Sequence, residues 1–115
     1  MKISIITISY NSSKTIEETL KAVQNQTYSR IEHIIVDGKS SDNTINICND
    51  FKHISKMVSE PDKGVYDAFN KGLNMATGEV VGFLNADDVF CDQHTLKKIS
   101  EAFDEQTDCV FANLN

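Results

Sequence analysis

The chain has 115 residues, a size that suits a single domain with one hydrophobic core. Hydrophobic residues make up 40% and charged residues 24%, which is ordinary for a soluble globular protein. With 17 acidic against 11 basic residues the formal charge is -6, which argues against nucleic acid as a partner. An acidic protein can still bind an anionic ligand when a divalent cation lies between them.

The cysteines and histidines show no disulfide or metal-site spacing. Cys48, Cys91 and Cys109 lie far apart, and we expect reduced, buried thiols. The three histidines lack H-x-x-x-H spacing and are expected at surface or boundary positions. Residues 1–13 are too polar for a signal peptide and nothing resembles a membrane span, so we expect a cytoplasmic location. A peripheral position of the parent enzyme at the inner face of the membrane stays open.

Strand-like and helix-like stretches alternate along the chain. The β-branched run 3–8 predicts a strand buried on both faces, after which Ser12 or Ser13 would cap a helix over 14–25. The further elements expected are a strand over 31–36, a helix capped within 40–42, a strand over 56–58, a helix from Val65 ended by Gly78, a strand over 79–84, a helix from Asp92 or Thr95 to Phe103, and a strand over 109–112. This alternation predicts an α/β domain with a mainly parallel sheet and helices on both faces.

Polar side chains fall at the carboxyl ends of the predicted strands. They are Ser9, Tyr10 and Asn11 after the first strand, Asp37 after the second, and Asp87 and Asp88 after the fourth. If the first and fourth strands are neighbours, these groups converge on the crevice where open α/β sheets bind ligands. The adjacent carboxylates of Asp87 and Asp88 suit Mg²⁺ or Mn²⁺, although a turn or a helix cap explains the same pair.

Three weaker signals concern a nucleotide. Asp37 could accept hydrogen bonds from a base edge, and Ser9 and Tyr10 could supply a hydroxyl and an apolar wall. Lys63 could meet a diphosphate at a helix N-terminus. Taken singly, each residue is explained better by a strand-end loop or a solvated turn.

Six motifs follow one another in a recognisable order. They are I-I-T-I-S-Y-N at 5–11, Q-N-Q-T-Y at 24–28, I-V-D-G-K-S-S-D-N-T at 35–44, S-E-P-D-K-G-V-Y-D-A-F-N-K-G at 59–72, A-T-G-E at 76–79 and F-L-N-A-D-D at 83–88. This ordered set resembles family 2 glycosyltransferases, the inverting group with the GT-A fold. The segment 59–72 is similar to a version found in bacterial polysaccharide-synthesis members, and 83–88 looks like the DXD-type metal site of the family.

The resemblance implies a Rossmann-like three-layer sandwich that is truncated at its C-terminal side. Residues 1–115 would be the nucleotide-sugar-binding part, without the acceptor-binding part. A sugar would pass from a nucleotide sugar, in the first place a UDP-sugar, to a saccharide or lipid-linked acceptor, with Mn²⁺ or Mg²⁺ as cofactor. The family places its general base beyond Asn115, so we expect negligible transfer by this chain alone. An exposed sheet edge would favour a homo-oligomer.

The resemblance also assigns individual residues. Ser9, Tyr10 and Asn11 would line the nucleotide, Asp37 would bind the base, Asp87 would lie near the ribose, Asp88 would ligate the metal, and Asp62, Lys63, Gly64 and Asn70 would flank the pocket. The chain departs from the family at Gly38, where many members have a second aspartate, and at Phe69, where many have an arginine. The second departure removes a positive charge, so diphosphate contact would rest on the metal and Lys63.

Two other classes of protein remain as alternatives. A nucleotidyltransferase can have the same kind of sheet and the same use of a metal ion. It normally has a basic glycine-rich loop after its first strand, however, and residues 9–14 are not such a loop. A non-catalytic nucleotide-binding module is the second alternative, and metal-dependent nucleotide affinity would separate it from a donor site. A dehydrogenase is excluded by the lack of G-x-G-x-x-G.

Overall fold

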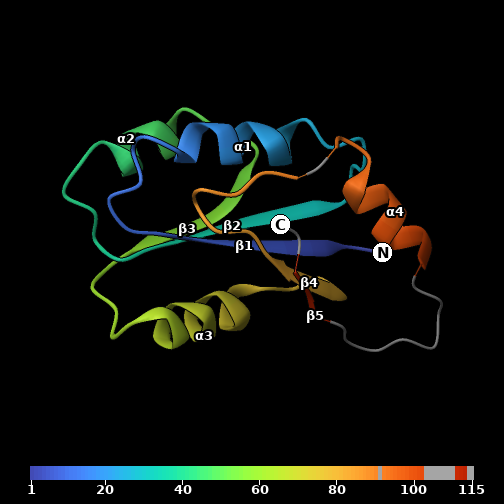
Figure 1. Ribbon diagram of the computed structural model, residues 1–115. Helices are drawn as coiled ribbons and strands as arrows, with labels where there is room; N and C mark the ends of the chain where they lie inside the picture. The colour runs from blue at the N-terminus through green and yellow to red at the C-terminus, as the bar shows by residue number, and fades with distance from the viewer. Residues whose placement is uncertain (91, 103–110, 114–115) are drawn as a thin grey trace.

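The computed structural model describes residues 1–90, 92–102 and 111–113 (Figure 1). Its elements are β1 (Ile3–Ser9), α1 (Ile16–Gln24), β2 (Ile31–Asp37), α2 (Thr44–Asn49), β3 (Ile54–Ser59), α3 (Val65–Met75), β4 (Val80–Phe83), α4 (Thr95–Ala102) and β5 (Phe111–Asn113). The strands form one sheet in the order β3-β2-β1-β4-β5, and all of its pairings are parallel. The predicted α/β alternation and parallel sheet are therefore confirmed.

Helices cover both faces of the sheet. Figure 1 shows α1 and α2 over one face and α3 over the other. Leu96 of α4 packs with Val23 of α1 in one buried cluster, so α4 lies on the α1 side. Residues of β1 alternate between the layers: Ile5 faces α1 and α4, whereas Ile6 packs with Ala68 of α3. Within the described residues no helix is long and apolar enough to cross a membrane.

The starts of the helices differ from the prediction. Neither Ser12 nor Ser13 caps α1 through its side chain; the N-cap is Thr15, without a side-chain cap hydrogen bond. Ser12 instead supplies its carbonyl oxygen to the N–H groups of Thr15 and Ile16. The backbone N–H of Ser12 donates to the Thr44 hydroxyl at the start of α2, and that of Ser13 donates to Asp42 in the loop after β2.

Gly78 does not end α3, because the helix stops at Met75 and Ala76 follows in extended conformation. A Cβ atom on Gly78 would lie 2.6 Å from Ser4 Oγ and 2.8 Å from the Lys2 carbonyl oxygen. The glycine therefore permits the close approach of the chain to β1.

The other boundaries shift by a few residues. Strand β3 is longer than the predicted 56–58, and β5 occupies Phe111–Asn113 where the prediction had 109–112. Cys91, Phe103 and Cys109 lie outside the described residues. Cys48 is a buried free thiol, as predicted.

The surface or boundary position predicted for His33 is wrong. Its side chain is fully buried on β2, with Nε2 2.8 Å from Thr7 Oγ1 and Nδ1 3.0 Å from His53 Nε2. Burial, together with repulsion from His53, lowers the pKa of His33 to about 3. Burial also lowers the pKa of the half-buried His53. Both rings are therefore neutral in the folded chain at neutral pH, and a polar chain Thr7–His33–His53 is part of the core.

We predict that stability falls as the pH drops below 6.5. The unfolded chain takes up a proton at His33 near 6.5, whereas the folded chain does so only near 3, so the free energy of unfolding rises with pH between those values. The expected slope for this residue is up to about 1.4 kcal/mol per pH unit. Urea unfolding of wild type and His33→Gln between pH 7.5 and 5 measures it, and the variant should have the flatter profile. The exposed His94→Gln is the control, and parallel profiles for wild type and His33→Gln would contradict the prediction.

Candidate functional site

The order of the strands sets the position of the site. The chain adds β2 and β3 on one side of β1 and then returns to place β4 and β5 on the other. A crevice therefore opens between the carboxyl ends of β1 and β4, the point where ligands bind in such sheets. A pocket of about 680 Å³ lies there. The first and fourth strands are neighbours, as the convergence of the polar residues required.

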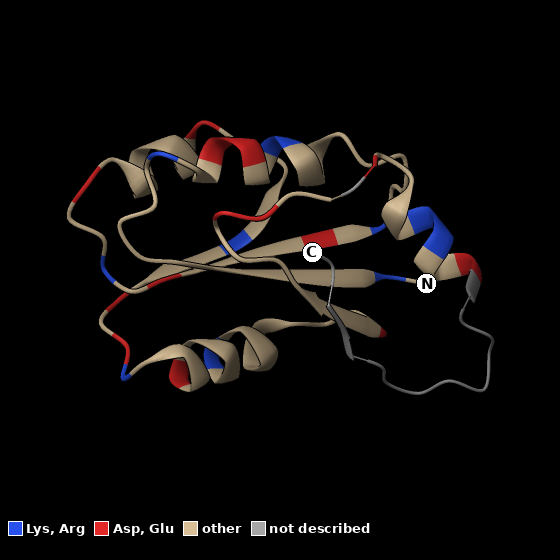
Figure 2. Ribbon diagram, in the orientation of Figure 1, with Lys and Arg blue, Asp and Glu red and all other residues tan. Residues whose placement is uncertain are grey.

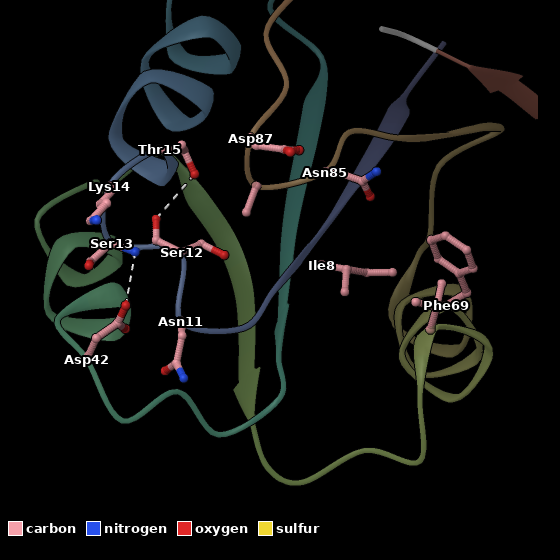
Figure 3. Close-up of a pocket in the computed structure, with 12 residues that line it drawn as sticks. Ile8, Asn11, Ser12, Ser13, Lys14, Thr15, Asp42, Phe69, Asn85 and Asp87 are labelled. Atoms are coloured by element: carbon pink, nitrogen blue, oxygen red, sulfur yellow. Dashed lines mark hydrogen bonds between the residues drawn. The ribbon is translucent and has the colours of Figure 1, made fainter.

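The pocket has a polar wall and an apolar wall (Figure 3). Residues 11–15, which lead into α1, line one side together with Asp42, while Asn85, Ala86 and Asp87 lie along the loop after β4. On the other side are Ile8 and, from α3, Val65 and Phe69. The Phe69 ring is fixed edge-on against Phe83, with the ring centroids 4.5 Å apart.

Asp37 lies at the end of β2 and is fully buried. The hydroxyl groups of Ser9 and Ser40 each donate to its Oδ1 at 2.6 Å. Its Oδ2 accepts the Ser40 backbone N–H at 2.7 Å and the Ser59 hydroxyl at 2.8 Å. Burial would raise the pKa of Asp37, but these donors outweigh it and hold the pKa below its usual value. The charged carboxylate thus joins the ends of β1, β2 and β3.

The loops after β1 and β2 are bound to each other. Asn11 Oδ1 accepts the Ser41 N–H at 2.8 Å, and Asp42 accepts the Ser13 N–H at 3.1 Å. Asn11 and Lys39 both adopt positive φ, 48° and 65°. Non-glycine residues in this region carry a conformational cost that the surrounding contacts must offset. The hydrogen bonds between the two loops supply those contacts.

The turn after β4 presents two carboxylates. The Asp88 N–H donates to the Asn85 carbonyl oxygen at 3.0 Å, and the Asp88 carbonyl oxygen accepts the Thr19 hydroxyl at 2.6 Å. Asp87 is exposed at the pocket, and Asp88 is half-buried beside it. Among the described residues, no donor hydrogen-bonds to either side-chain carboxylate, so both pairs of oxygens are free to act as ligands.

These free oxygens fit a hard divalent cation. Mg²⁺ and Mn²⁺ accept one or two protein carboxylates and complete their coordination with water and substrate phosphates. The described part of the chain holds no group of three or more acidic, histidine or cysteine side chains placed to bind a metal. Asp87 and Asp88 therefore suit a metal that arrives with, or is completed by, a phosphate ligand.

The structure brings together only some of the residues named from the sequence. Asn11 and Asp87 line the pocket, Ser9 and Asp37 lie buried next to it, and Tyr10 is exposed at 64% of its surface. Lys63 is exposed on the loop before α3 and is not among the described residues that line the pocket.

Sequence reasoning gave no role to Lys14, the one lysine or arginine among the described residues that line this pocket. Its signal was present, since it opens the predicted helix that follows a predicted site strand. Figure 2 shows Lys and Arg on several elements of the described chain, with a short basic stretch on α4. The positive charge at the pocket therefore comes from one side chain, that of Lys14, and not from a basic patch.

A family model, that of glycosyl transferase family 2, matches residues 4–115. The chain belongs to glycosyl transferase family 2. An uncharacterised glycosyltransferase of Nostoc sp. is 39% identical over 107 residues, which cover 90% of this chain and 33% of the relative. The recognition of this family from the sequence is thereby confirmed.

Solved structures show the same fold. Staphylococcus aureus TarS in complex with UDP-GlcNAc has a TM-score of 0.82 at 30% identity, covering 88% of this chain and 30% of that one. The mannosyltransferase PcManGT of Pyrobaculum calidifontis, in complex with GDP-Man and Mn²⁺, has a TM-score of 0.84 at 27% identity, covering 92% and 33%. The predicted GT-A fold is confirmed, and the chain spans about a third of the length of the relative and of the two solved structures.

We predict that Asp37→Asn destabilises the chain by about 2–4 kcal/mol, because the amide cannot accept from all four donors that now surround the carboxylate. Urea unfolding at pH 7 measures the loss. Asp50→Asn, an exposed position at the end of α2, is the matched control. Equal unfolding free energies for the two variants would contradict a structural role for the Asp37 carboxylate.

Proposed function

We propose that this chain binds the nucleotide-sugar donor of a glycosyltransferase, and that residues 1–115 form the donor-binding part. The observation that carries the proposal is a pair of carboxylates to which no described residue donates, Asp87 in the lining of the β1–β4 pocket and Asp88 next to it in sequence, in a family 2 chain. TarS is described with UDP-GlcNAc and PcManGT with GDP-Man and Mn²⁺, which supports a nucleoside-diphosphate sugar and a divalent metal.

In this proposal different residues contact different parts of the donor. Asp88 and Asp87 would hold Mn²⁺ or Mg²⁺, and Asn11 and Asp87, which both line the pocket, would contact the ribose. When bound, the metal supplies Lewis-acid stabilisation of the departing nucleoside diphosphate. The donor is a UDP-sugar, and the acceptor is a saccharide or a lipid-linked saccharide in polysaccharide synthesis.

A lysine at the pocket replaces the missing positive charge of the family. Phe69 stands in the apolar wall, so the pocket lacks the arginine that many members carry there. Lys14, on the wall that faces Phe69, is the one lysine among the described residues that line the pocket, whereas Lys63 is exposed on the loop before α3. We therefore assign diphosphate contact to Lys14 in place of Lys63.

The test of the donor site is calorimetric titration of UDP, with GDP as comparison, in the presence and absence of Mn²⁺. We expect UDP binding that requires Mn²⁺ and that Asp88→Ala abolishes, because this carboxylate would hold the cation that neutralises the diphosphate. Asp50→Asn should bind as wild type does. Affinity for UDP that is the same with and without Mn²⁺ would overturn the metal site, and no binding of either nucleotide would overturn the donor site.

The two lysines can be compared in the same assay. We expect Lys14→Ala to weaken UDP binding roughly threefold to tenfold through the loss of one charge-assisted contact. Lys63→Ala should weaken UDP binding clearly less than Lys14→Ala does. Uridine, which lacks phosphates, should bind wild type and Lys14→Ala alike. The opposite ranking of the two variants would return the diphosphate contact to Lys63.

A further inference from the structure

Asp37, the carboxylate expected from the sequence to bind the base, has no acceptor position left for a ligand. Asp37 has about four acceptor positions on its two oxygens, and four hydrogen bonds from Ser9, Ser40 and Ser59 fill them. Its side chain is also 0% exposed. A base edge could reach Asp37 only by displacing one of these serines, so in this arrangement Asp37 positions the loops and another group must contact the base.

A second carboxylate lies at the neighbouring position. A Cβ atom built on Gly38 would lie 2.9 Å from Asp62 Oδ2 and 3.3 Å from Tyr10 Cδ1. The Asp62 carboxylate and the Tyr10 ring therefore meet over Gly38, at the carboxyl ends of β1 and β2. An aspartate at position 38, as in many family members, would compete with Asp62 for this space.

The Asp62 carboxylate is half free. Its Oδ1 accepts the Gly64 backbone N–H at 3.1 Å, which fixes the orientation of the group. Among the described residues nothing donates to Oδ2, the oxygen that faces Gly38 and Tyr10. Asp62 thus presents one acceptor atom beside an aromatic ring.

The loop that carries Asp62 is held in place. Lys71 on α3 donates to the Pro61 carbonyl oxygen at 3.1 Å and forms ion pairs with Glu60 at 3.1 Å and Asp67 at 3.5 Å. The Glu60 N–H donates to the Asp37 carbonyl oxygen at 3.0 Å, which continues the ladder of β2 and β3. A preorganised acceptor binds with less loss of conformational entropy than a mobile one.

We propose that Asp62 is the residue that selects the base of the donor, and that the base is uracil. The inference rests on the proposed donor site. The exposed Tyr10 ring offers a face on which a base can stack. The single free oxygen of Asp62 accepts the one imide N–H of uracil. Cytosine presents a lone pair at the same ring position and is rejected, and guanine presents two adjacent donors, of which one would stay unpaired.

The replacement Asp62→Asn gives a sharp test. The Gly64 N–H still needs an acceptor and takes the amide oxygen, which places the amide NH₂ where Oδ2 was. That NH₂ opposes the uracil imide and matches the cytosine lone pair. We expect wild type to prefer UDP over CDP by roughly tenfold or more, and the variant to lose UDP affinity roughly 10- to 100-fold and to prefer CDP.

Titration of UDP, CDP and GDP in the presence of Mn²⁺ measures these preferences in wild type, Asp62→Asn and the control Asp50→Asn. An unchanged ratio of UDP to CDP affinity in Asp62→Asn, with wild type binding UDP, overturns the role of Asp62 and leaves the donor site standing. Tighter binding of GDP than of UDP by wild type overturns the choice of uracil. The absence of any nucleotide binding by wild type removes the donor site and the inference together.

A carboxylate swap separates base contact from a general effect on the loop. Asp62→Ala should lose the preference for UDP over CDP, and the double variant Gly38→Asp with Asp62→Ala should regain it, because the new carboxylate occupies the vacated space. Gly38→Asp alone should bind worse than wild type, since it places two carboxylates together. A double variant that folds, by circular dichroism, without regaining the preference counts against the proposal.

Discussion

The buried carboxylate of Asp37 is the constraint on which the site depends. A charge removed from water is tolerated only when donors surround it, and here the donors come from Ser9, Ser40 and Ser59. These residues end β1, begin the loop after β2 and end β3. Satisfying one charge therefore sets the relative positions of three segments. The two residues with positive φ, Asn11 and Lys39, lie in the loops that follow Ser9 and Asp37.

Glu32 is a second buried carboxylate, and it lies near the N-terminal end of β2, the strand that ends at Asp37. Glu32, at 4% exposure, accepts from the Ser4 hydroxyl and the Thr77 N–H and pairs with Lys56 at 3.3 Å. Burial opposes its ionisation, but the hydrogen bonds, first that of the Thr77 backbone and then that of Ser4, lower the pKa of Glu32 to about 2. Because Thr77 follows α3, this cluster anchors the C-terminal end of that helix. The helix then carries its N-terminal end, with Phe69, to the pocket.

Periodicity and strand-end chemistry were enough to predict the sheet and the edge that bears the site. Apolar runs such as 3–8 have one stable place in a parallel sheet, at its centre. Side-chain partners could not be predicted in the same way, because they depend on loop paths that local sequence does not determine. The burial of His33 needed Thr7 and His53 as partners, and the position of Lys14 at the pocket depended on the path of the loop after β1.

At the two positions that depart from the family pattern, Gly38 and Phe69, residues distant in sequence lie close in space. Gly38 lacks a carboxylate, yet Asp62 brings one to within 2.9 Å of where its Cβ would be, from a loop 24 positions further along. Phe69 lacks a charge, and Lys14 is among the residues that line the same pocket. A ligand responds to the position of an oxygen or an ammonium group and not to the strand that supplies it. In a site assembled from four loops, a missing group at one position is therefore weak evidence for a missing function, because the neighbouring loop can provide it.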